Sequence, residues 1–223
     1  MATSIDHTPT TPTPSPTPRR RRKEARPAEI LAAALDSFVE RGYEGSRLED
    51  IAHRAGCTKG TVFLYYESKA ELFKAAVRQT MLPMLQAAEQ TVEGHRGSAR
   101  ELLESLLRQR WQAMNHTRLA GLPKLMLAEA SQFPELARFY HDEIIERSHA
   151  LLRRVLDLGV ERGEFAAMDS ANVARVSIAP ILLAAVWRHS FAPVVEHPVD
   201  PEAFFESALS VLFRGIAAPA KDH

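Results

Sequence analysis

Apolar residues recur every three or four positions along most of the chain, the spacing that places them on one face of an α-helix. The helical pattern begins at Pro27, and its first apolar run consists of Ile30, Leu31, Ala34, Leu35, Phe38 and Val39. Gly42 follows this run, where a glycine commonly ends a helix. No segment alternates apolar and polar residues between turn signals, as a half-buried β-strand would. The pattern therefore predicts an all-α protein.

Capping signals mark where two further helices begin. Ser46 with Glu49, and Ser68 with Glu71, both have the Ser-x-x-Glu spacing of a capping box. In such a box the serine hydroxyl accepts a hydrogen bond from the backbone N–H three residues later. We therefore expect one helix to begin at each serine.

The second half of the chain contains three longer helical patterns. The first begins at Pro134 and continues to the 159–163 region, and the others cover residues 172–187 and 202–216. The 172–187 segment is apolar on nearly every side. Such a helix is buried on several sides, inside a bundle or against a partner chain.

Residues 52–62 have the spacing of a helix-turn-helix, in which two helices are joined by a tight turn. Ala52 is small enough for close helix crossing, Gly56 lies at the turn, and Val62 returns an apolar side chain to the core. Thr58 is placed to cap the second helix. The N-terminal residues of that helix, Lys59 among them, would then face a DNA groove.

Composition and charge agree with a soluble protein that meets nucleic acid at its N-terminal end. The chain has 223 residues, 45% of them apolar, and no net charge. Residues 1–78 carry 13 Lys and Arg against 10 Asp and Glu, a net charge of +3. The remaining residues carry 15 Lys and Arg against 18 Asp and Glu, a net charge of −3. The single cysteine, Cys57, excludes an intrachain disulfide and suits a reducing compartment. We expect a cytoplasmic protein with no signal peptide and no membrane span.

The N-terminal segment differs in composition from the rest. Residues 1–18 are rich in Thr, Ser and Pro, and a basic block follows at residues 19–23. A segment with so little to bury is expected to be disordered. The basic block is either a solubilising leader or an arm that touches DNA, and the sequence leaves both readings open.

The stretch "LEDIAHRAGCTKGTVFLYYESKAELF" resembles the DNA-binding domain of the TetR family of transcriptional regulators, over roughly residues 26–77. The resemblance implies a three-helix DNA-binding head and a larger α-helical bundle that binds a ligand and dimerises. We accordingly divide the chain into a tail and basic arm (1–25), a helix-turn-helix domain (26–78), a ligand-binding and dimerisation domain (79–217) and a C-terminal tail (218–223). Residues 122–152 also look like the C-terminal domain of one TetR subgroup.

The resemblance also implies which residues contact DNA. Carried over by position, they are Arg47, Thr58, Lys59, Gly60, Thr61, Phe63, Tyr65 and Lys69. Lys69 would reach a phosphate from the start of the following helix. Phe63 departs from the family, which often has Tyr there, so a hydroxyl that would meet a phosphate is absent.

The remainder of the chain contains the candidates for ligand binding and dimerisation. Candidates for an apolar ligand pocket are Trp111, Met114, His116, Met126, Phe133, Phe139 and Trp187. Candidates for a dimer interface built from the last two helices are Ile178, Ile181, Leu182, Ala185, Phe205, Leu209, Leu212 and Phe213. Each of these residues has an alternative role in the core of the protomer.

The sequence therefore favours a ligand-responsive regulator, more specifically a repressor that binds a palindromic operator as a homodimer. Its expected partners are double-stranded operator DNA, a second copy of the chain and an unknown small-molecule effector. No cofactor and no metal are expected. An enzyme is disfavoured. The enzyme class that a helical bundle would suggest is a di-iron protein, which needs two Glu-x-x-His pairs, and the sequence has one, Glu146 with His149. The other alternative is an interaction protein whose head no longer binds DNA.

Overall fold

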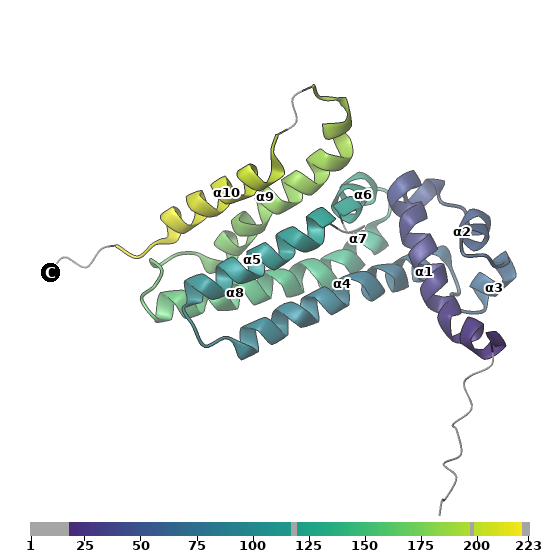
Figure 1. Cartoon of the computed structure of the whole chain (residues 1–223), viewed down its shortest axis with the longest axis horizontal. Helices are drawn as coiled ribbons and strands as arrows, with labels where there is room; N and C mark the ends of the chain where they lie inside the picture. Colours follow the sequence, from purple (N-terminus) through teal and green to yellow (C-terminus); the bar gives the residue numbers. More distant parts are fainter. Residues whose placement is uncertain (1–17, 117–119, 197–198, 220–223) are drawn as a thin grey trace, which may run out of the picture.

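The computed structural model describes residues 18–116, 120–196 and 199–219, with the backbone alone at residues 18–25, 115 and 116. Every regular element in these residues is helical, and the single extended pairing is an isolated bridge between Phe165 and Ala217. The predicted all-α fold is confirmed. Figure 1 shows an elongated molecule with a small head at one end and a longer helical body.

The head consists of α1 (Pro18–Gly45), α2 (Leu48–Arg54), α3 (Lys59–Phe63) and the first turns of α4 (Lys69–Gly94). Its interior is a continuous apolar cluster, of which Phe38, Ile51, Val62 and Phe73 are almost fully buried members. Ala52 is also buried, and Gly56 has a φ of +64°, which permits the tight turn between α2 and α3. The helix-turn-helix predicted for residues 52–62 is therefore present.

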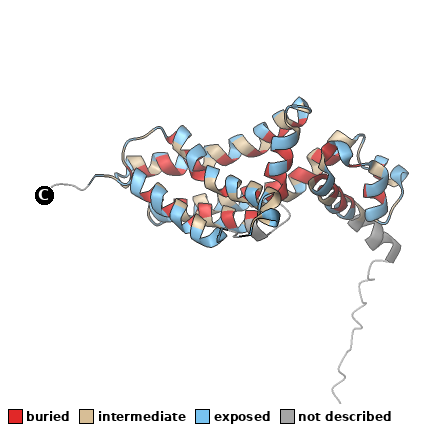
Figure 2. Cartoon of the chain, turned by 90° about the horizontal axis from the view of Figure 1, so that it is seen from above, coloured by how far each residue is buried: buried red, intermediate tan, exposed pale blue. Residues whose placement is uncertain are grey.

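The body contains α5 (Ala99–His116), α6 (Gly121–Glu129), α7 (Pro134–Tyr140), the π-helix η2 (His141–Ile145), α8 (Glu146–Glu161), α9 (Ser170–Ser190), the short 3-10 helix η3 (Ala192–Val194) and α10 (Pro201–Ile216). In Figure 1 the helices α4, α5, α8, α9 and α10 lie along the length of the body, while α6 and α7 lie at its junction with the head. Figure 2 shows buried residues running along the inner faces of these helices.

The helix α4 belongs to both parts of the molecule. It begins at Lys69 beneath the head and continues through the body to Gly94. The expected domain boundary after residue 78 therefore falls inside a continuous helix.

The start of α1 departs from the expected disordered segment of residues 1–25. The helix begins at Pro18, so its first turns include the basic block at residues 19–23. Arg, Lys, Glu and Ala favour helices, and Pro is well suited to the first helical position. Pro27, which suggested a helix start, lies inside α1 instead. Residues 1–17 and 220–223, both expected to be tails, lie outside the described residues.

Of the two predicted capping boxes, only the second is observed as a cap. The Ser68 hydroxyl accepts a hydrogen bond from the backbone N–H of Glu71 at 3.1 Å. Ser46 lies before the start of α2 and is buried, and its hydroxyl donates to the carbonyl oxygen of Gly42 at 2.7 Å. Arg47 occupies the N-terminal capping position of α2 without a side-chain capping bond, so the Ser46 prediction was wrong.

The later helices agree with the predicted segments. Pro134 opens α7, and the helical path continues through η2 and α8 to Glu161. The sequence pattern did not indicate the π-helical turn at η2. Asp169 and Asp200 cap α9 and α10 through hydrogen bonds from backbone N–H groups.

The helix α9 is apolar enough to be compared with a membrane span. It is the one helix in the described residues that has the length and hydropathy to cross a bilayer, with a mean hydropathy of 1.5 over its most apolar window. It packs against α8, α6, α5 and α10, so it serves as a central helix of the bundle.

Candidate functional site

The short helix α3 is held in place by its cap and by α1. The Thr58 hydroxyl accepts a hydrogen bond from the backbone N–H of Thr61 at 3.2 Å, so the predicted cap is present. The Arg26 guanidinium of α1 donates to the carbonyl oxygens of Ala55 and Gly56 at 3.1 and 3.2 Å. These bonds fix the turn before α3 and hence the direction in which α3 projects.

The structure leaves most of the predicted DNA contacts exposed, at the start of α2 and in and around α3, at the end of the head. Those that are exposed are Arg47, Thr58, Lys59, Gly60, Phe63 and Tyr65, and Thr61 is partly buried. Leu64, which the sequence reasoning passed over, is 83% exposed between Phe63 and Tyr65. Exposed apolar residues at the tip of a helix-turn-helix can pack on sugars or thymine methyl groups.

Lys59 is paired in the free protein. Its Nζ lies 2.6 Å from Glu49 Oε1, and this hydrogen bond lowers the pKa of Glu49. Both side chains are largely exposed. The pair is therefore accessible to competition from a phosphate.

Lys69 does not extend freely into solvent, as a phosphate contact was expected to do. Its Nζ donates to the carbonyl oxygen of Glu44 at 3.1 Å and lies 4.6 Å from the centre of the Tyr43 ring. Burial lowers the pKa of Lys69, and the nearby carboxylate of Glu129 opposes that shift. Lys69 thus contributes to the junction between head and body in the free protein.

The junction also joins the end of α1 to α6. The carboxylate of Glu129, the last residue of α6, accepts a hydrogen bond from the backbone N–H of Tyr43 at 2.9 Å. The Tyr43 ring packs edge-on against Phe133, with centroids 4.7 Å apart. Gly42 has a φ of +79°, so the predicted end of the regular α1 helix is confirmed. The head is therefore connected to the body through α6 as well as through α4.

Ion pairs connect α4 to the start of the α7–α8 path. Lys74 contacts both Glu71 and Glu135, and Arg78 makes a two-pronged contact with Glu143. The hydrogen bond from Arg78 lowers the pKa of Glu143. These pairs are partly exposed, so they add orientation more than stability.

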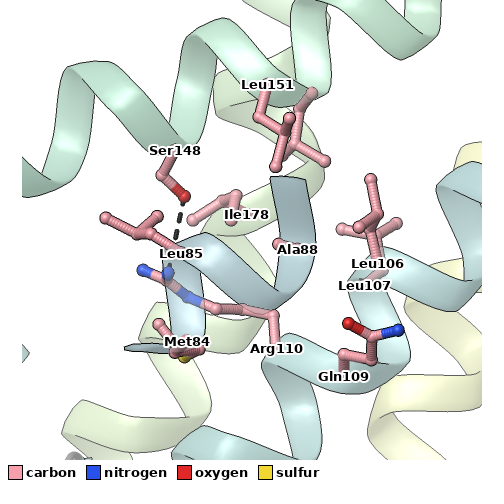
Figure 3. Close-up of a pocket in the computed structure, with 11 residues that line it drawn as sticks. Met84, Leu85, Ala88, Leu106, Leu107, Gln109, Arg110, Ser148, Leu151 and Ile178 are labelled. Atoms are coloured by element: carbon pink, nitrogen blue, oxygen red, sulfur yellow. Dashed lines mark hydrogen bonds between the residues drawn. The ribbon is translucent and has the colours of Figure 1, made fainter. Parts of the chain in front are cut away.

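The body contains a small apolar cavity at the centre of the bundle, with a volume of about 40 Å³. It lies between α4, α5, α8 and α9 (Figure 3). Its lining residues are Met84, Leu85, Ala88, Leu106, Leu107, Gln109, Arg110, Ser148, Leu151, Leu152 and Ile178.

None of the ligand candidates named from the sequence lines this cavity. Met114, Met126 and Phe139 are buried core residues, and Phe133 lies at the head–body junction. The His116 side chain lies outside the described residues. The sequence shows which helix face is buried, but not which buried residues border a gap.

The two tryptophans, also ligand candidates, have separate roles in the body. Trp111 stacks on Phe205 with ring centroids 4.5 Å apart and donates its indole N–H to Glu202 at 2.8 Å, so it joins α5 to α10. Trp187 is 38% exposed and packs on Phe191. It lines a surface groove between α9 and α10, and this groove has no lining residue in common with the central cavity.

The polar groups of the cavity come from residues that the apolar pattern did not single out. The Arg110 Nη1 donates weakly to the Ser148 hydroxyl at 3.4 Å, as Figure 3 shows. The enclosed atoms Arg110 Nε and His149 Nδ1 have no hydrogen-bond partner among the described residues. Arg110 could have been noticed, because it interrupts the apolar stripe Leu103, Leu106, Leu107, Trp111 and Met114 at a core position.

Most of the predicted dimer residues are in the core of the protomer. Ile178, Ile181, Ala185, Phe205, Leu209 and Phe213 are all buried within a single chain, where a partner cannot reach them. Leu182 and Leu212 are partly buried against the same core. The apolar residues that α9 and α10 do expose are Val176, Leu183, Trp187 and Val211. The proposed interface therefore moves to this opposite face of the two helices.

Within the described residues, no group of three or more His, Cys, Asp and Glu side chains is arranged to hold a metal ion. His141 and Glu146 approach each other at 3.5 Å on the exposed surface. Cys57 is half-buried, and burial raises the pKa of its thiol. A thiol of this kind is a poor nucleophile.

Comparisons with known proteins agree with the two-part architecture. Residues 30–76 match the family described as bacterial regulatory proteins, tetR family, and residues 94–201 match the tetracyclin repressor-like C-terminal domain. The chain belongs to the TetR family. Its head is the family's helix-turn-helix domain, and its body is the family's helical ligand-binding domain.

Individual relatives match either the head or most of the chain. The HTH-type transcriptional regulator RutR of Escherichia coli is 44% identical over 57 residues, which is 26% of this chain and only 27% of RutR. The fatty acid metabolism regulator protein of Bacillus subtilis is 26% identical over 160 residues, covering 70% of this chain and 80% of that protein. The structure of FadR from Bacillus subtilis in complex with stearoyl-CoA has a TM-score of 0.68 at 22% identity, covering 85% of this chain and 98% of FadR.

Proposed function

We propose that this protein is a transcriptional repressor that binds a palindromic operator as a homodimer and is released by a small, largely apolar molecule. The observation that supports this most directly is the continuous helix α4, which begins beneath the head and borders the cavity of the body. A change in the cavity can reach the head through this one continuous helix. Membership of the TetR family agrees with this arrangement.

Operator binding would use the exposed surface of α3. Thr58, Lys59 and Thr61 lie at the N-terminal end of this helix, which in a helix-turn-helix enters the major groove. Lys59 would exchange its contact with Glu49 for a phosphate or a base edge. A hydroxyl and an ammonium at this place can donate to both.

Dimerisation would use the face of α9 and α10 that carries Val176, Leu183, Trp187 and Val211. These residues are exposed in the single chain although they are large and apolar. Pairing them across a two-fold axis would form a four-helix interface and remove this surface from water. Two heads held about one DNA turn apart would then read the two halves of a palindrome.

Release would follow from a difference in ligand affinity between two shapes of the body. A ligand that favours a more open bundle shifts the population toward heads set at the wrong spacing. α4 would carry this shift, and the α1–α6 contact through Glu129 and Tyr43 would move with it. The stearoyl-CoA bound by the FadR structure contains a long apolar chain, which suits an apolar effector here.

The test is a selection of bound fragments from genomic DNA, performed with the full chain at low and at high salt. We expect a common palindromic sequence to be enriched, with two chains bound per site. The matched variant Lys59→Ala should lose the enrichment, whereas Lys124→Ala, an exposed change on α6, should keep it. Equal recovery of all fragments by the wild type and by Lys59→Ala would instead favour a head that has lost operator binding.

A further inference from the structure

The residue Arg110 occupies a position in α5 where the fold calls for an apolar side chain. It lies one turn after Leu106 and Leu107 and one turn before Met114, all of which are buried. Its guanidinium reaches inward between α4, α8 and α9, toward Ser148 (Figure 3). Arg110 is thus directed into the bundle and not along its surface.

The Arg110 guanidinium has incomplete hydrogen bonding. Its enclosed Nε has no partner among the described residues, and its bond to the Ser148 hydroxyl is long, at 3.4 Å. Burial lowers the pKa of Arg110, and the group that opposes this shift is the Tyr140 hydroxyl, with no carboxylate of the described residues acting beside it. A partly enclosed charge without an opposite charge is costly, and an incoming anion would offset that cost.

The other arginines of the bundle show the contrast. Arg108, two residues earlier on α5, contacts the carboxylates of Glu104 and Glu206 at the surface. Arg78 is held by Glu143. Arg110 is the inward-facing arginine of α5, and it is surrounded by Leu85, Leu107 and Ile178 in place of acidic residues.

We propose that Arg110 receives the carboxylate of a small apolar acid, whose hydrocarbon part packs among the apolar side chains that line the cavity. This assignment rests on the proposed function, because the acid would be the effector that binds in the body and releases the protein from DNA. A guanidinium binds a carboxylate through two parallel N–H···O bonds, and Arg110 has an unused Nε for one of them. The Ser148 and Tyr140 hydroxyls are the neighbouring groups that can donate to the same anion.

The charge and polarity of the site favour a carboxylate over a phosphate. A phosphate group brings close to two negative charges at neutral pH, whereas the cavity offers one cation. The remaining lining residues are apolar, apart from Gln109 and Ser148. A monoanion with an apolar body therefore matches both the single charge and the walls.

Because the cavity is small, the body must change shape before an organic acid can bind in it. At about 40 Å³ the cavity is much smaller than the several hundred Å³ of an ordinary ligand site. An organic acid can enter only if α4, α5, α8 and α9 separate. The π-helix η2 lies between Tyr140 and Ser148, and such turns are frequent at functional sites.

The test compares acids with their uncharged amides on the full chain. Butyrate, octanoate and benzoate are titrated against butyramide, octanamide and benzamide, with binding measured by calorimetry and by the shift in Tm. We expect at least one carboxylate to bind the wild type about ten- to a hundredfold more tightly than its amide, the range of a charge-assisted pair. If no carboxylate binds better than its amide, the assignment is overturned.

Two variants separate a binding role from a structural one. Arg110→Met keeps an unbranched apolar stem but removes the guanidinium and its charge, and Arg108→Met is the control on the same helix. We expect Arg110→Met to lose the preference for the carboxylate while its Tm without ligand stays equal or rises. Arg108→Met should keep the preference. Arg110→Lys keeps the charge but lacks the parallel N–H donors of a guanidinium, so it should bind the carboxylate with intermediate affinity. This variant replaces Arg110→Met in the test if Arg110→Met does not fold.

The outcomes also distinguish this inference from the proposed function. If the selected operator is bound and is released by stearoyl-CoA equally in wild type and Arg110→Met, while no free carboxylate acts, the role of Arg110 is wrong and the proposed function stands. If no operator is bound, the proposed function fails. Even then, the carboxylate site at Arg110 is supported if the wild type prefers the carboxylate to its amide and Arg110→Met does not.

Discussion

Phe63 lies near the end of α3 and is 45% exposed, with the Nζ of Lys59 5.8 Å from the centre of its ring. Phe63 is therefore accessible to a DNA partner in the free protein. The side chain is not a buried plug that a larger residue would displace.

The substitution Phe63→Tyr should strengthen operator binding by about 0.5–1.5 kcal/mol, the net contribution of one neutral hydrogen bond. Because the change adds no charge, the dependence of affinity on salt should remain the same. Fluorescence anisotropy with the selected operator at several salt concentrations measures both quantities. Weaker binding by Phe63→Tyr would show that Phe63 makes a close apolar contact with DNA.

The substitution Glu49→Gln should strengthen DNA binding at low salt, because it removes the carboxylate that holds Lys59 and would face the phosphates. The gain should diminish as salt screens exposed charges. Glu161→Gln, at the far end of α8, removes the same charge away from the head and is the control. An equal gain in both variants would indicate an effect of net charge alone.

For single residues, the sequence predicted the features that depend on neighbours a few positions away along the chain. The Thr58 cap and the glycine turn at Gly56 are local patterns, and both are present. Ser46 was misjudged because the break of α1 at Gly42 places that carbonyl within reach of its hydroxyl. The bond between Lys69 and Glu44 could not be foreseen, because it forms only once α1 folds against α4. Arg110 was missed for a related reason, since its isolation among apolar side chains exists only in the assembled bundle.

The end of α1 lies close against α6. Gly42 has a positive φ, and a Cβ added there would lie 2.7 Å from Oε1 of Glu129, the oxygen that accepts the Tyr43 N–H. The backbone angle requires glycine, whereas an added Cβ would push the end of the Glu129 side chain away from Tyr43. The same carboxylate helps to hold the head against the body.

The substitution Gly42→Ala should lower the free energy of unfolding by about 1–3 kcal/mol, because its φ of +79° with a ψ of 169° is a backbone region open essentially to glycine alone. Gly45→Ala is the matched control, because Gly45 does not have a positive φ and an added Cβ would meet only an ordinary contact at 3.8 Å. That control should be neutral or slightly stabilising, since Ala favours helix. Urea denaturation measures both, and equal stability of the two variants would contradict the backbone strain expected at Gly42.

The helices themselves were largely predictable, and the exceptions have physical causes. Pro134 and the periodic apolar residues placed α7, α8, α9 and α10 correctly. The turn η2 was not foreseen because π-helical turns are rare, so a helical pattern without a break indicates an ordinary α-helix. The early start of α1 was missed because Pro27 was given more weight than the helix-favouring residues before it.

Over the whole molecule, the basic block at residues 19–23 continues α1 at the head end of the molecule (Figure 1). This position keeps open the prediction that the block reaches DNA beside the operator. Removing residues 1–23 should reduce the salt dependence of log K by about 0.9 for each phosphate that the block would otherwise neutralise, counted in both chains of the dimer. Removing residues 1–17 alone should leave it unchanged. If both truncations bind like the full chain at low salt, the block does not touch DNA.

The interface face of α9 and α10 allows the proposed dimer to be separated from the fold of the protomer. Leu183 is 55% exposed, and its side chain is not part of the buried core. The substitution Leu183→Glu should therefore leave the protomer folded while placing a charge inside an apolar interface, where burial without a partner is costly. Sedimentation should show a monomer.

DNA binding by Leu183→Glu should then fall steeply, because each head must bind its half-site without the high effective concentration supplied by its partner. The slope of log K against log salt should also fall to about half, since one head contacts about half of the phosphates. Leu127→Glu, on α6 and 73% exposed, introduces the same charge at another apolar surface position and should change neither quantity. A Leu183→Glu protein that stays dimeric would place the interface elsewhere. A monomer that retained full operator affinity would show that the two heads act independently.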